Sequence, residues 1–482
     1  MKKELKPACV FGQFARINAI PRPSKREEKM IAYLKEFGES RGLETVVDET
    51  GNVLIRKGAT PGYEDRETII LQSHMDMVCE KLPDCQIDFD NDPIETYVDG
   101  EWLRAKGTTL GADDGIGMAM ELALLDADDI EHGPIECVFT RDEETGLTGA
   151  EGMKAGFMTG KMLINLDSED EGQIFVSCAG GKRTQAVFHP RYEEATEGLF
   201  FIKIGVNALT GGHSGDDINK KRANAVKLLS RFIYSLMEKG SVRLGNLNAG
   251  GLHNAIPRDG EMTIAVPWAE KENVRAAFNV FVCNIEEEFH VTEPNVNLYM
   301  ESAEPEPTVT EEDSRKIIYA LQGVDNGIMS MCQDKAIEWL VETSSNLASV
   351  KTQEDGSILV TTSQRSNVMS ALDNMCATVR AVFQLAGAEV DTGEGYPAWK
   401  MNPDSKLTKT VVETYKEIFG KEPKVLGIHA GLECGLFAER YPNLDMVSMG
   451  PTLRGVHSPD ERLLIPTVDM VWRHLLAILK KK

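Results

Sequence analysis

The sequence predicts an α/β fold, in which a domain with a mostly parallel central sheet is interrupted by an α+β domain. Short apolar runs alternate with helical stretches in the first part of the chain, a pattern that favours a parallel sheet. Near Lys182 the pattern changes to alternating strands and amphipathic helices, and the α/β pattern returns after the segment GEGYPAW. We therefore expect residues 1–185 and 390–482 to form one discontinuous α/β/α domain, and residues 186–389 to form the inserted domain.

The first elements are a helix and four short strands. Ser24 and Glu27 have the spacing of a capping box, and apolar residues follow at helical spacing. The apolar positions of this helix are Met30, Ile31, Leu34 and Phe37. The runs that predict strands are NVLIRKG, TIILQS, IECVFT and MLINLD. A helix rich in Met, Ala and Leu is expected from Gly115 to Leu125, between the second and third of these runs.

The later elements follow the change of pattern. The predicted strands of the inserted domain include RTQAVFHP, LFFIKIGVNAL, GEMTIAVP, NVNLYME and SILVTTSQRS. Its predicted helices are NAVKLLSRFIYSLMEKG, with an apolar stripe along one face, and VMSALDNMCATVRAVFQLAG. The last part of the chain predicts a helix in KLTKTVVETYKEIFG, a strand in LDMVSMG and a closing helix in VDMVWRHLLAILK.

Composition narrows the class of protein. The 482 residues carry a net charge of −24, from 52 basic and 76 acidic residues. Such a surface repels phosphate backbones and anionic lipids, so we expect no nucleic acid or membrane partner. The nine cysteines are scattered without a Cys-x-x-Cys pair, and the amino-terminal segment MKKELKPACVFGQF lacks the apolar stretch of a signal peptide. These features indicate a cytoplasmic protein with reduced thiols.

Polar residues that could carry chemistry follow several of the predicted strands. His74 ends the run TIILQS, and Asp76 points to the same side two residues later, at the sheet edge where ligands bind in open α/β folds. Alone, this pair is more typical of an ordinary strand end. The same types of residue recur at other strand ends and at a helix start; they are Asp113, Asp114, Asp142, Glu143, Glu144, Asp167 and His457.

Several carboxylates gathered at one edge need a positive charge to neutralise them. Two divalent metal ions would supply it, and histidine with carboxylate ligands and no thiolate suits zinc, with manganese or cobalt as alternatives. Adjacent glutamates fit such a site, because one can bind a metal ion while the other acts as a general base. The segment DEE taken alone is more typical of a solvated loop.

Segments along most of the chain resemble one known family. They are HMDMV, GTTLGADDGIGMA, DEETGLTGA, LINLDSEDEG, GGHSGDDI, SQRS, HAGLECG and GVHSPDER. Together they are similar to the co-catalytic zinc peptidases and deacylases, which include glutamate carboxypeptidases, tripeptidases and carnosinases. Their order and spacing are most similar to those of the aminoacyl-histidine dipeptidases. The resemblance implies a catalytic domain with a central sheet and a lid domain, through which family members often form a homodimer.

The resemblance also implies the metal ligands. His74 and Asp167 would bind one metal ion, Glu144 and His457 would bind the other, and Asp113 would bridge the two. The family usually has Asn or another residue after the bridging acid, whereas this sequence has Asp114. The sequence therefore leaves open which of the two aspartates is the bridge.

Glu143 would be the general base that takes a proton from a metal-activated water and returns it to the leaving amine, and Asp76 would orient His74. The resemblance implies further residues that bind substrate: His213 at the oxyanion, Asn254, and Arg365 at the terminal carboxylate. His429 and Glu433 are expected near the specificity pocket, without a defined role.

The expected function is metal-dependent hydrolysis of small peptides, with Xaa-His dipeptides such as β-alanyl-histidine as substrates. A tripeptidase, a broader dipeptidase or aminopeptidase and an N-acyl amino acid deacylase are alternatives on the same scaffold. A non-catalytic relative is disfavoured because competent residues occupy all the expected ligand positions and position 143. A dinuclear phosphoesterase is disfavoured because Arg365 suits a carboxylate and no phosphate-binding glycine loop accompanies it.

Overall fold

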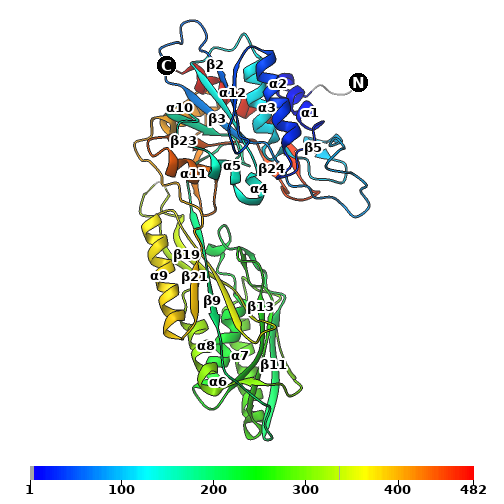
Figure 1. The fold of residues 1–482 in the computed structure, drawn as a ribbon, viewed down its shortest axis with the longest axis vertical. Coiled ribbons are helices and arrows are strands. Elements are labelled where there is room, and N and C mark those ends of the chain that lie inside the picture. Colours follow the sequence, from blue (N-terminus) through cyan, green and yellow to red (C-terminus); the bar gives the residue numbers. More distant parts are fainter. Residues whose placement is uncertain (1–4, 336, 482) are drawn as a thin grey trace. The chain divides into compact units, whose positions relative to one another are not determined.

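The computed structural model describes residues 5–335 and 337–481, which form two compact units (Figure 1). The first unit comprises Met1–Cys178, Trp399–Gly427 and Leu432–Lys482, and the second comprises Ala179–Ala398 and Ile428–Gly431. The return of 428–431 to the second unit was not anticipated from the sequence. Residues 1–4 lie outside the described residues. They are the first residues of the segment in which we expect no signal peptide.

The first unit is built on an eight-stranded sheet in the order β1-β2-β6-β3-β7-β23-β8-β22. Its strands are β1 (Glu44–Val47), β2 (Val53–Lys57), β3 (Ile69–His74), β6 (Ile135–Thr140), β7 (Met162–Asn165), β8 (Gln173–Cys178), β22 (Lys424–Ile428) and β23 (Asp445–Ser448). The four central strands β6, β3, β7 and β23 pair in parallel. β1, β2 and β8 join antiparallel, so the expected parallel sheet is confirmed for its centre. The carboxyl ends of the central strands therefore meet at one edge.

The first unit contains helices as well as this sheet. They are α1 (Ala8–Ile17), α2 (Glu28–Ser40), α3 (Ala112–Asp126), α4 (Glu143–Gly146), α5 (Thr148–Gly152), α10 (Lys406–Phe419), α11 (Glu433–Arg440) and α12 (Ile465–Lys480). Alternate strand residues such as Leu71 and Ile164 share one core cluster with apolar residues of α1, α2, α3, α10 and α12. Their neighbours Ile70 and Leu163 are also buried and point to the opposite face, as strand geometry requires.

A small four-stranded sheet in the first unit holds the loop that contains His457. Its strands are β4 (Thr96–Asp99), β5 (Trp102–Ala105), β24 (Leu453–Arg454) and β25 (Arg462–Leu464), in the order β24-β25-β5-β4. The loop between β24 and β25 contains His457, whose φ of +59° bends the chain sharply there. Pairing of β25 with β24 and with β5 therefore fixes where this loop begins and ends.

The predicted capping box before α2 is wrong. The helix begins at Glu28, and no side chain caps its first turn. Ser24 instead donates a hydrogen bond to Asp76 Oδ2 at 2.7 Å, and Glu27 accepts from Lys25 N and Arg141 Nε. Each side chain therefore has a charged partner from a distant segment, Asp76 for Ser24 and Arg141 for Glu27, in place of the backbone N–H groups of the helix end.

The second unit contains a nine-stranded sheet that is antiparallel in its pairings. Its strands are β9 (Gly180–Phe188), β11 (Leu199–Asn207), β13 (Arg243–Gly250), β15 (Gly260–Pro267), β16 (Asn297–Ser302), β18 (Gly327–Met331), β19 (Val341–Thr352), β20 (Ile358–Ser366) and β21 (Glu389–Thr392). Two short ribbons pair β10 (Tyr192–Glu193) with β17 (Thr308–Val309) and β12 (Gly212–His213) with β14 (Ala255–Ile256). The helices are α6 (Ala225–Met237), α7 (Lys271–Glu288), α8 (Glu311–Gly323) and α9 (Met369–Leu385). They pack on the sheet around a second core, as the apolar stripe of α6 predicts.

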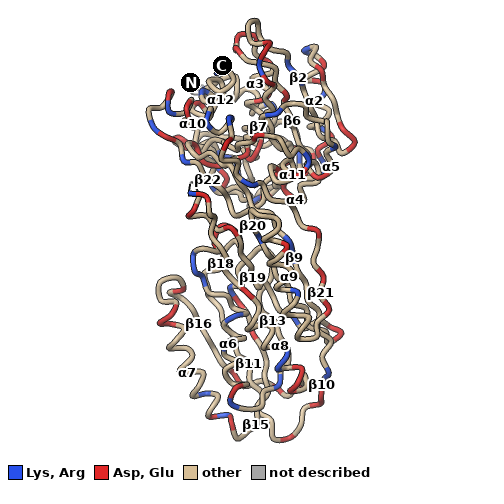
Figure 2. The backbone as a smooth tube through the Cα atoms, turned by 90° about the vertical axis from the view of Figure 1, so that its left-hand side faces the viewer, with Lys and Arg blue, Asp and Glu red and all other residues tan. Residues whose placement is uncertain are grey.

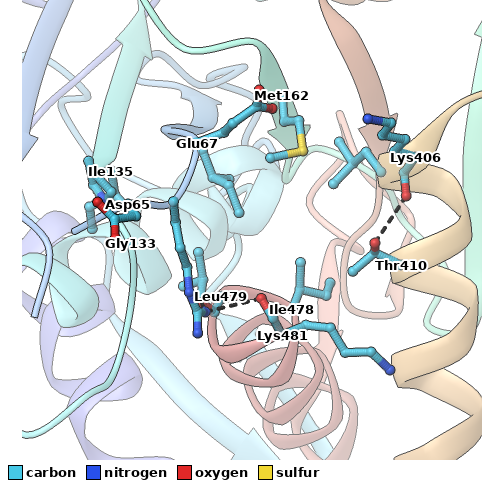
Figure 3. Close-up of a pocket in the computed structure, with 14 residues that line it drawn as sticks. Asp65, Glu67, Gly133, Ile135, Met162, Lys406, Thr410, Ile478, Leu479 and Lys481 are labelled. Carbon is cyan, nitrogen blue, oxygen red and sulfur yellow. Dashed lines mark hydrogen bonds between the residues drawn. The ribbon is translucent and has the colours of Figure 1, made fainter. Parts of the chain in front are cut away.

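Acidic and basic residues are interspersed over both units, so the acidic excess is spread along the chain (Figure 2). Within the described residues, no helix is both long and apolar enough to cross a bilayer. A cavity of about 370 Å³ lies in the first unit at the amino ends of β3, β6 and β7, beside α10 and α12 (Figure 3). The cavity is thus at the sheet edge opposite the carboxyl ends of these strands.

Candidate metal-binding active site

The predicted metal ligands of the first unit gather at the carboxyl edge of the central strands. His74 is the last residue of β3, and it pairs with Thr140 at the end of β6. Asp167 follows β7 by two residues, and Glu144 lies in the short helix α4 after β6. Asp113 comes from the first turn of α3. Parallel pairing places these ends together, which is the reason for the convergence.

Asp113 lies between the imidazoles of His74 and His457. Its Oδ1 is 3.1 Å from His74 Nε2, and its Oδ2 is 3.2 Å from His457 Nε2. Asp167 Oδ1 is 3.5 Å from His74 Nε2, and Glu144 Oε2 is 2.9 Å from His457 Nε2. Each imidazole thus has one carboxylate of its own and shares the third, which is the arrangement expected of two ions with a bridging ligand.

Asp114 occupies a different position from Asp113, although the two are joined by a cis peptide bond. Its Oδ1 accepts a hydrogen bond from Gly117 N at 3.1 Å, inside the same helix, and the side chain is buried. Burial raises the pKa of Asp114 well above its ordinary value. The geometry therefore favours Asp113 over Asp114 as the shared carboxylate.

The carboxylates and imidazoles of the cluster shift one another's pKa values. Burial opposes charge on His74, yet Asp167 and Asp113 hold its pKa well above the ordinary value. Hydrogen bonds to Asp113 and Glu144 raise the pKa of His457 to about 11. Burial raises the pKa of Asp167 well above its ordinary value. Metal binding at this cluster would therefore depend on pH, because divalent ions would displace protons from its imidazoles and carboxylates.

The residues present fit a pair of divalent metal ions. Ligand atoms of His74, Asp113 and Glu144 all lie within 4.8 Å of one another. Glu144 Oε1 is buried and has no hydrogen-bond partner in the described part of the chain, so a carboxylate oxygen is left for an ion. Imidazole nitrogens and carboxylate oxygens without thiolates suit zinc, manganese or cobalt.

Asp76 supports the cluster from behind. Its Oδ1 is 3.2 Å from His74 Nδ1, the nitrogen that faces away from the other ligands. The same carboxylate accepts the backbone N–H groups of Glu143 at 3.0 Å and Glu144 at 3.3 Å. His74 and these donors outweigh burial and keep the pKa of Asp76 below its ordinary value. Asp76 thereby orients the imidazole and holds the loop that carries both glutamates.

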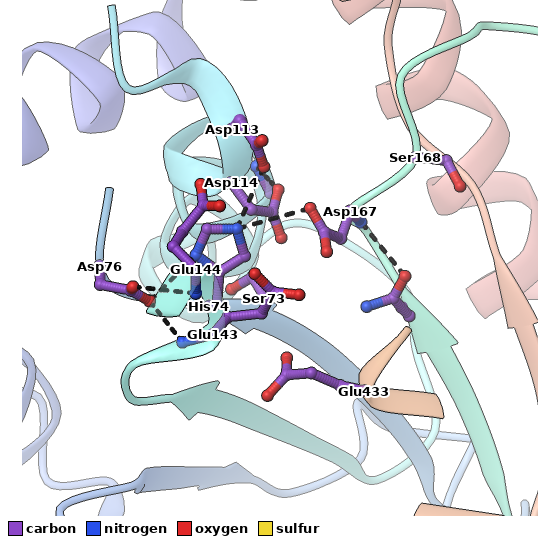
Figure 4. A network of polar contacts seen from close by, with 12 residues as sticks. Ser73, His74, Asp76, Asp113, Asp114, Glu143, Glu144, Asp167, Ser168 and Glu433 are labelled. Carbon is purple, nitrogen blue, oxygen red and sulfur yellow. Dashed lines mark hydrogen bonds and ion pairs between the residues drawn. The ribbon is translucent and has the colours of Figure 1, made fainter. Parts of the chain in front are cut away.

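Glu143 and Glu433 are the two other carboxylates of this edge (Figure 4). Burial raises the pKa of Glu143 well above its ordinary value, and the charges of Glu433 and Glu144 add to the rise. Glu433, at the start of α11, is buried, and its Oε2 accepts from Gln72 Nε2 at 2.7 Å and Thr140 Oγ1 at 2.8 Å. Burial raises its pKa to about 7, against the opposing charge of His74. Its Oε1 is buried without a hydrogen-bond partner among the described residues.

The second unit brings together other predicted residues. Arg365, near the end of β20, is only 7% exposed, and it donates to Tyr396 Oη at 2.6 Å. Its other terminal nitrogen is 3.4 Å from His213 Nε2. Asn254 accepts the N–H of Ser214, next to His213, through its backbone carbonyl. These contacts place a guanidinium, a phenol and an imidazole in one cluster of the second unit.

His429 belongs to this second cluster. It is buried, and its Nε2 lies 2.7 Å from Ser344 Oγ. Burial and the charge of Arg365 lower its pKa to about 3, so the imidazole is neutral at physiological pH. His429 therefore acts as a neutral hydrogen-bonding group in this cluster.

Sequence reasoning did not assign Arg22, Ser24, Tyr396 or Glu461 to these clusters, although each contacts one of them. Glu461 lies in the segment GVHSPDER, four residues after His457, so its nearness was a usable signal. Arg22 offered none, because a lone arginine in a loop is usually on the surface. Tyr396 lies in GEGYPAW, which served only as a boundary.

The chain belongs to peptidase family M20/M25/M40, whose family model matches residues 70–481. The resemblance stated from the motifs is thereby confirmed. The chain is 39% identical over 479 residues to the cytosol non-specific dipeptidase of Escherichia coli (strain K12). The alignment covers 99% of this chain and 98% of that protein. The crystal structure of aminoacylhistidine dipeptidase from Vibrio alginolyticus matches with a TM-score of 0.92 and 40% identity, over 99% of this chain and 97% of that one. An aminopeptidase structure from Bacillus cereus, with a TM-score of 0.58 and 16% identity over 99% of both chains, shares the fold.

Proposed function

We propose that this protein is a cytoplasmic dinuclear metal-dependent dipeptidase whose substrates include Xaa-His dipeptides. The observation that carries the proposal is Asp113, with one oxygen toward each of His74 and His457 and with Glu143 in the same group of residues. The similarity to a non-specific dipeptidase and to an aminoacylhistidine dipeptidase supports dipeptides as the substrate class.

The proposed mechanism divides the work among the residues of the first unit. His74 and Asp167 would hold one ion, Glu144 and His457 the other, and Asp113 both. Two divalent ions, when bound, supply Lewis-acid activation of water and of the scissile carbonyl.

Glu143 would take the proton of the attacking water and deliver it to the leaving amine. Burial raises its pKa above the ordinary value, which is the direction that makes a carboxylate a stronger general base. Asp76 keeps His74 in the required orientation and holds the Glu143 backbone.

Residues of the second unit are proposed to bind the substrate. Arg365 would bind the terminal carboxylate of the substrate, because a guanidinium pairs with a carboxylate in a bidentate way. Tyr396 would hold the guanidinium of Arg365 through its hydroxyl group. His213 would stabilise the oxyanion, and Asn254 and His429 would offer hydrogen bonds. A homodimer formed through the 186–389 domain stays a prediction, as does the absence of nucleic acid and membrane partners.

The test is reconstitution of metal-stripped protein with zinc or manganese, followed by hydrolysis of β-alanyl-histidine and a panel of Xaa-His dipeptides. We expect no turnover without metal and turnover that saturates as two ions bind. If two ions bind and the peptides stay intact, the metal site stands and the substrate class is rejected. Tripeptides and N-acyl amino acids are then the next substrates to assay.

A variant at Glu433 can distinguish dipeptidase activity from deacylase activity. Its buried Oε1 has no partner among the described residues, so we propose that it accepts the free α-ammonium group of a dipeptide. Replacing Glu433 by glutamine removes a charged hydrogen bond, so kcat/KM for free-amine dipeptides is expected to fall about 10- to 100-fold. Hydrolysis of N-acetyl amino acids, which lack the ammonium group, should change little.

A matched control is Glu121→Gln. Glu121 is also fully buried in the first unit, where it accepts from Ser73 Oγ at 2.6 Å. This variant should leave the ratio of the two substrate classes unchanged. Equal losses on both classes in Glu433→Gln would show that Glu433 does not bind the amine.

A further inference from the structure

Residues 110–113, called here the 110–113 turn, span the start of α3 and include Asp113. A buried carboxylate from a distant part of the chain meets it: Glu461 is 2% exposed and lies in the loop that also carries His457. Its two oxygens accept four consecutive backbone N–H groups. The donors are Leu110 N at 2.7 Å, Gly111 N at 3.0 Å, Ala112 N at 2.8 Å and Asp113 N at 3.3 Å.

The buried guanidinium of Arg22 binds a backbone carbonyl group of the same turn. Arg22 is 1% exposed, and its Nη2 donates to Gly111 O. Its Nη1 donates to Met75 O at 3.2 Å and Asp76 O at 2.6 Å, directly after His74. One side chain therefore joins the strand end that carries His74 to the turn that carries Asp113.

Gly111 permits this arrangement. Its φ of +67° lies in the left-handed region, which favours glycine. A Cβ atom at this position would lie 2.6 Å from Arg22 Nη2 and 2.9 Å from Met77 Sδ. Only a residue without a side chain lets the guanidinium reach the backbone of the turn.

We propose that Glu461 and Arg22 are positioning residues that hold the 110–113 turn through its N–H and carbonyl groups, and thereby set Asp113 between His74 and His457. The inference rests on the proposed metal site and extends it. Neither residue would touch substrate. Glu461 ties Asp113 to the loop of His457, and Arg22 ties it to the segment of His74, so both ligand-to-ligand distances depend on them.

A plain structural role is the competing explanation, because an anion at the start of a helix stabilises the helix in any case. The two roles differ in what they change. A cap affects the free energy of unfolding, whereas a positioning residue also affects the affinity and coordination geometry of a bound ion. Loss of partners that orient metal ligands costs about 10- to 100-fold in metal affinity.

The experiment titrates metal-stripped full-length protein with Co²⁺ and records the visible absorption bands, which report the coordination geometry. Glu461→Gln keeps the size of the side chain but replaces one acceptor oxygen by an amide that cannot accept from the turn. We expect its Co²⁺ affinity to fall about 10- to 100-fold and its absorption bands to change. Thermal unfolding of the metal-free proteins measures the structural contribution separately.

Glu136→Gln is the matched control. Glu136 is 1% exposed and accepts from Thr159 N at 2.8 Å and Gly160 N at 3.1 Å, at the amino end of β6. This variant should lose stability to a similar degree while it keeps the wild-type Co²⁺ affinity and spectrum. Arg22→Lys is a second variant, because a single ammonium group cannot reproduce the fork that joins the two segments.

The outcomes separate the hypotheses. Weaker Co²⁺ binding in both Glu461→Gln and Arg22→Lys, with unchanged binding in Glu136→Gln, supports the inference. Wild-type affinity and spectrum in a folded Glu461→Gln or Arg22→Lys protein overturn it, as does an equal loss of affinity in Glu136→Gln. Wild-type protein that binds no Co²⁺ overturns the proposed function together with this inference.

Discussion

Replacing Glu143 by alanine or glutamine is expected to lower kcat about 100- to 10,000-fold, the usual contribution of a general base. Both metal ions should stay bound, because no metal ligand is removed and the backbone N–H of residue 143 still reaches Asp76. The measurement pairs steady-state kinetics on a dipeptide with the metal content of the same preparation.

The neighbouring residue is the control for this prediction. Glu144 Oε2 lies 2.9 Å from His457 Nε2, so Glu144→Gln is expected to lose activity together with one of the two ions. The two adjacent glutamates should thus fail in different ways. A Glu143 variant that loses metal to the same extent as Glu144→Gln would contradict the general-base role.

Exchanging Asp113 for asparagine is expected to weaken metal binding by about 100-fold or more, since even outer partners of a ligand contribute 10- to 100-fold. Asp113 faces both imidazoles, so its charge contributes to both ions. Asp114→Asn should leave metal affinity within a few-fold of wild type. Its amide oxygen can still accept from Gly117 N, and a buried carboxylate with a raised pKa is removed.

Metal affinity of the two variants, measured by competition with a chromogenic chelator, decides between the aspartates. The thermal unfolding of metal-free Asp114→Asn should be unchanged or shifted upward, because a buried carboxylate, whose Oδ2 has no hydrogen-bond partner among the described residues, is replaced by a group that does not ionise. Strong loss of metal in Asp114→Asn with near-normal binding in Asp113→Asn would reverse the assignment of the bridge.

The layout of the first unit followed from sequence pattern. The four runs before residue 170 that predict strands are β2, β3, β6 and β7 of the sheet, and the helix expected from Gly115 to Leu125 lies within α3. Apolar runs of this length are strands because both faces of a central parallel strand are buried. The antiparallel edges were not predicted, because pairing direction depends on connections and not on the composition of a single strand.

Local signals were less dependable where a distant partner competes. Ser24 and Glu27 have the spacing of a cap, yet both bind side chains or backbone from other segments. The same holds for the domain boundary, where residues 428–431 group with the second unit although the helix and strand around them belong to the first. Short-range patterns describe local preference, and tertiary contacts override it at such positions.

The sequence by itself indicated the candidate residues and the elements that carry them: His74 and Asp167 after strands, Glu143 and Glu144 after another, and His457 in a late loop. Periodicity places His74 and Asp76 on one side of the sheet, whereas the ligand roles were implied only by the resemblance to a family. Only the tertiary structure decided that Asp113, and not Asp114, lies between the imidazoles, and that Glu461 holds its turn from about 350 residues away in the chain. Such contacts depend on where a distant loop lies in the folded chain. Nearly every residue has a backbone N–H group, so the sequence does not indicate which of these groups a distant carboxylate will bind.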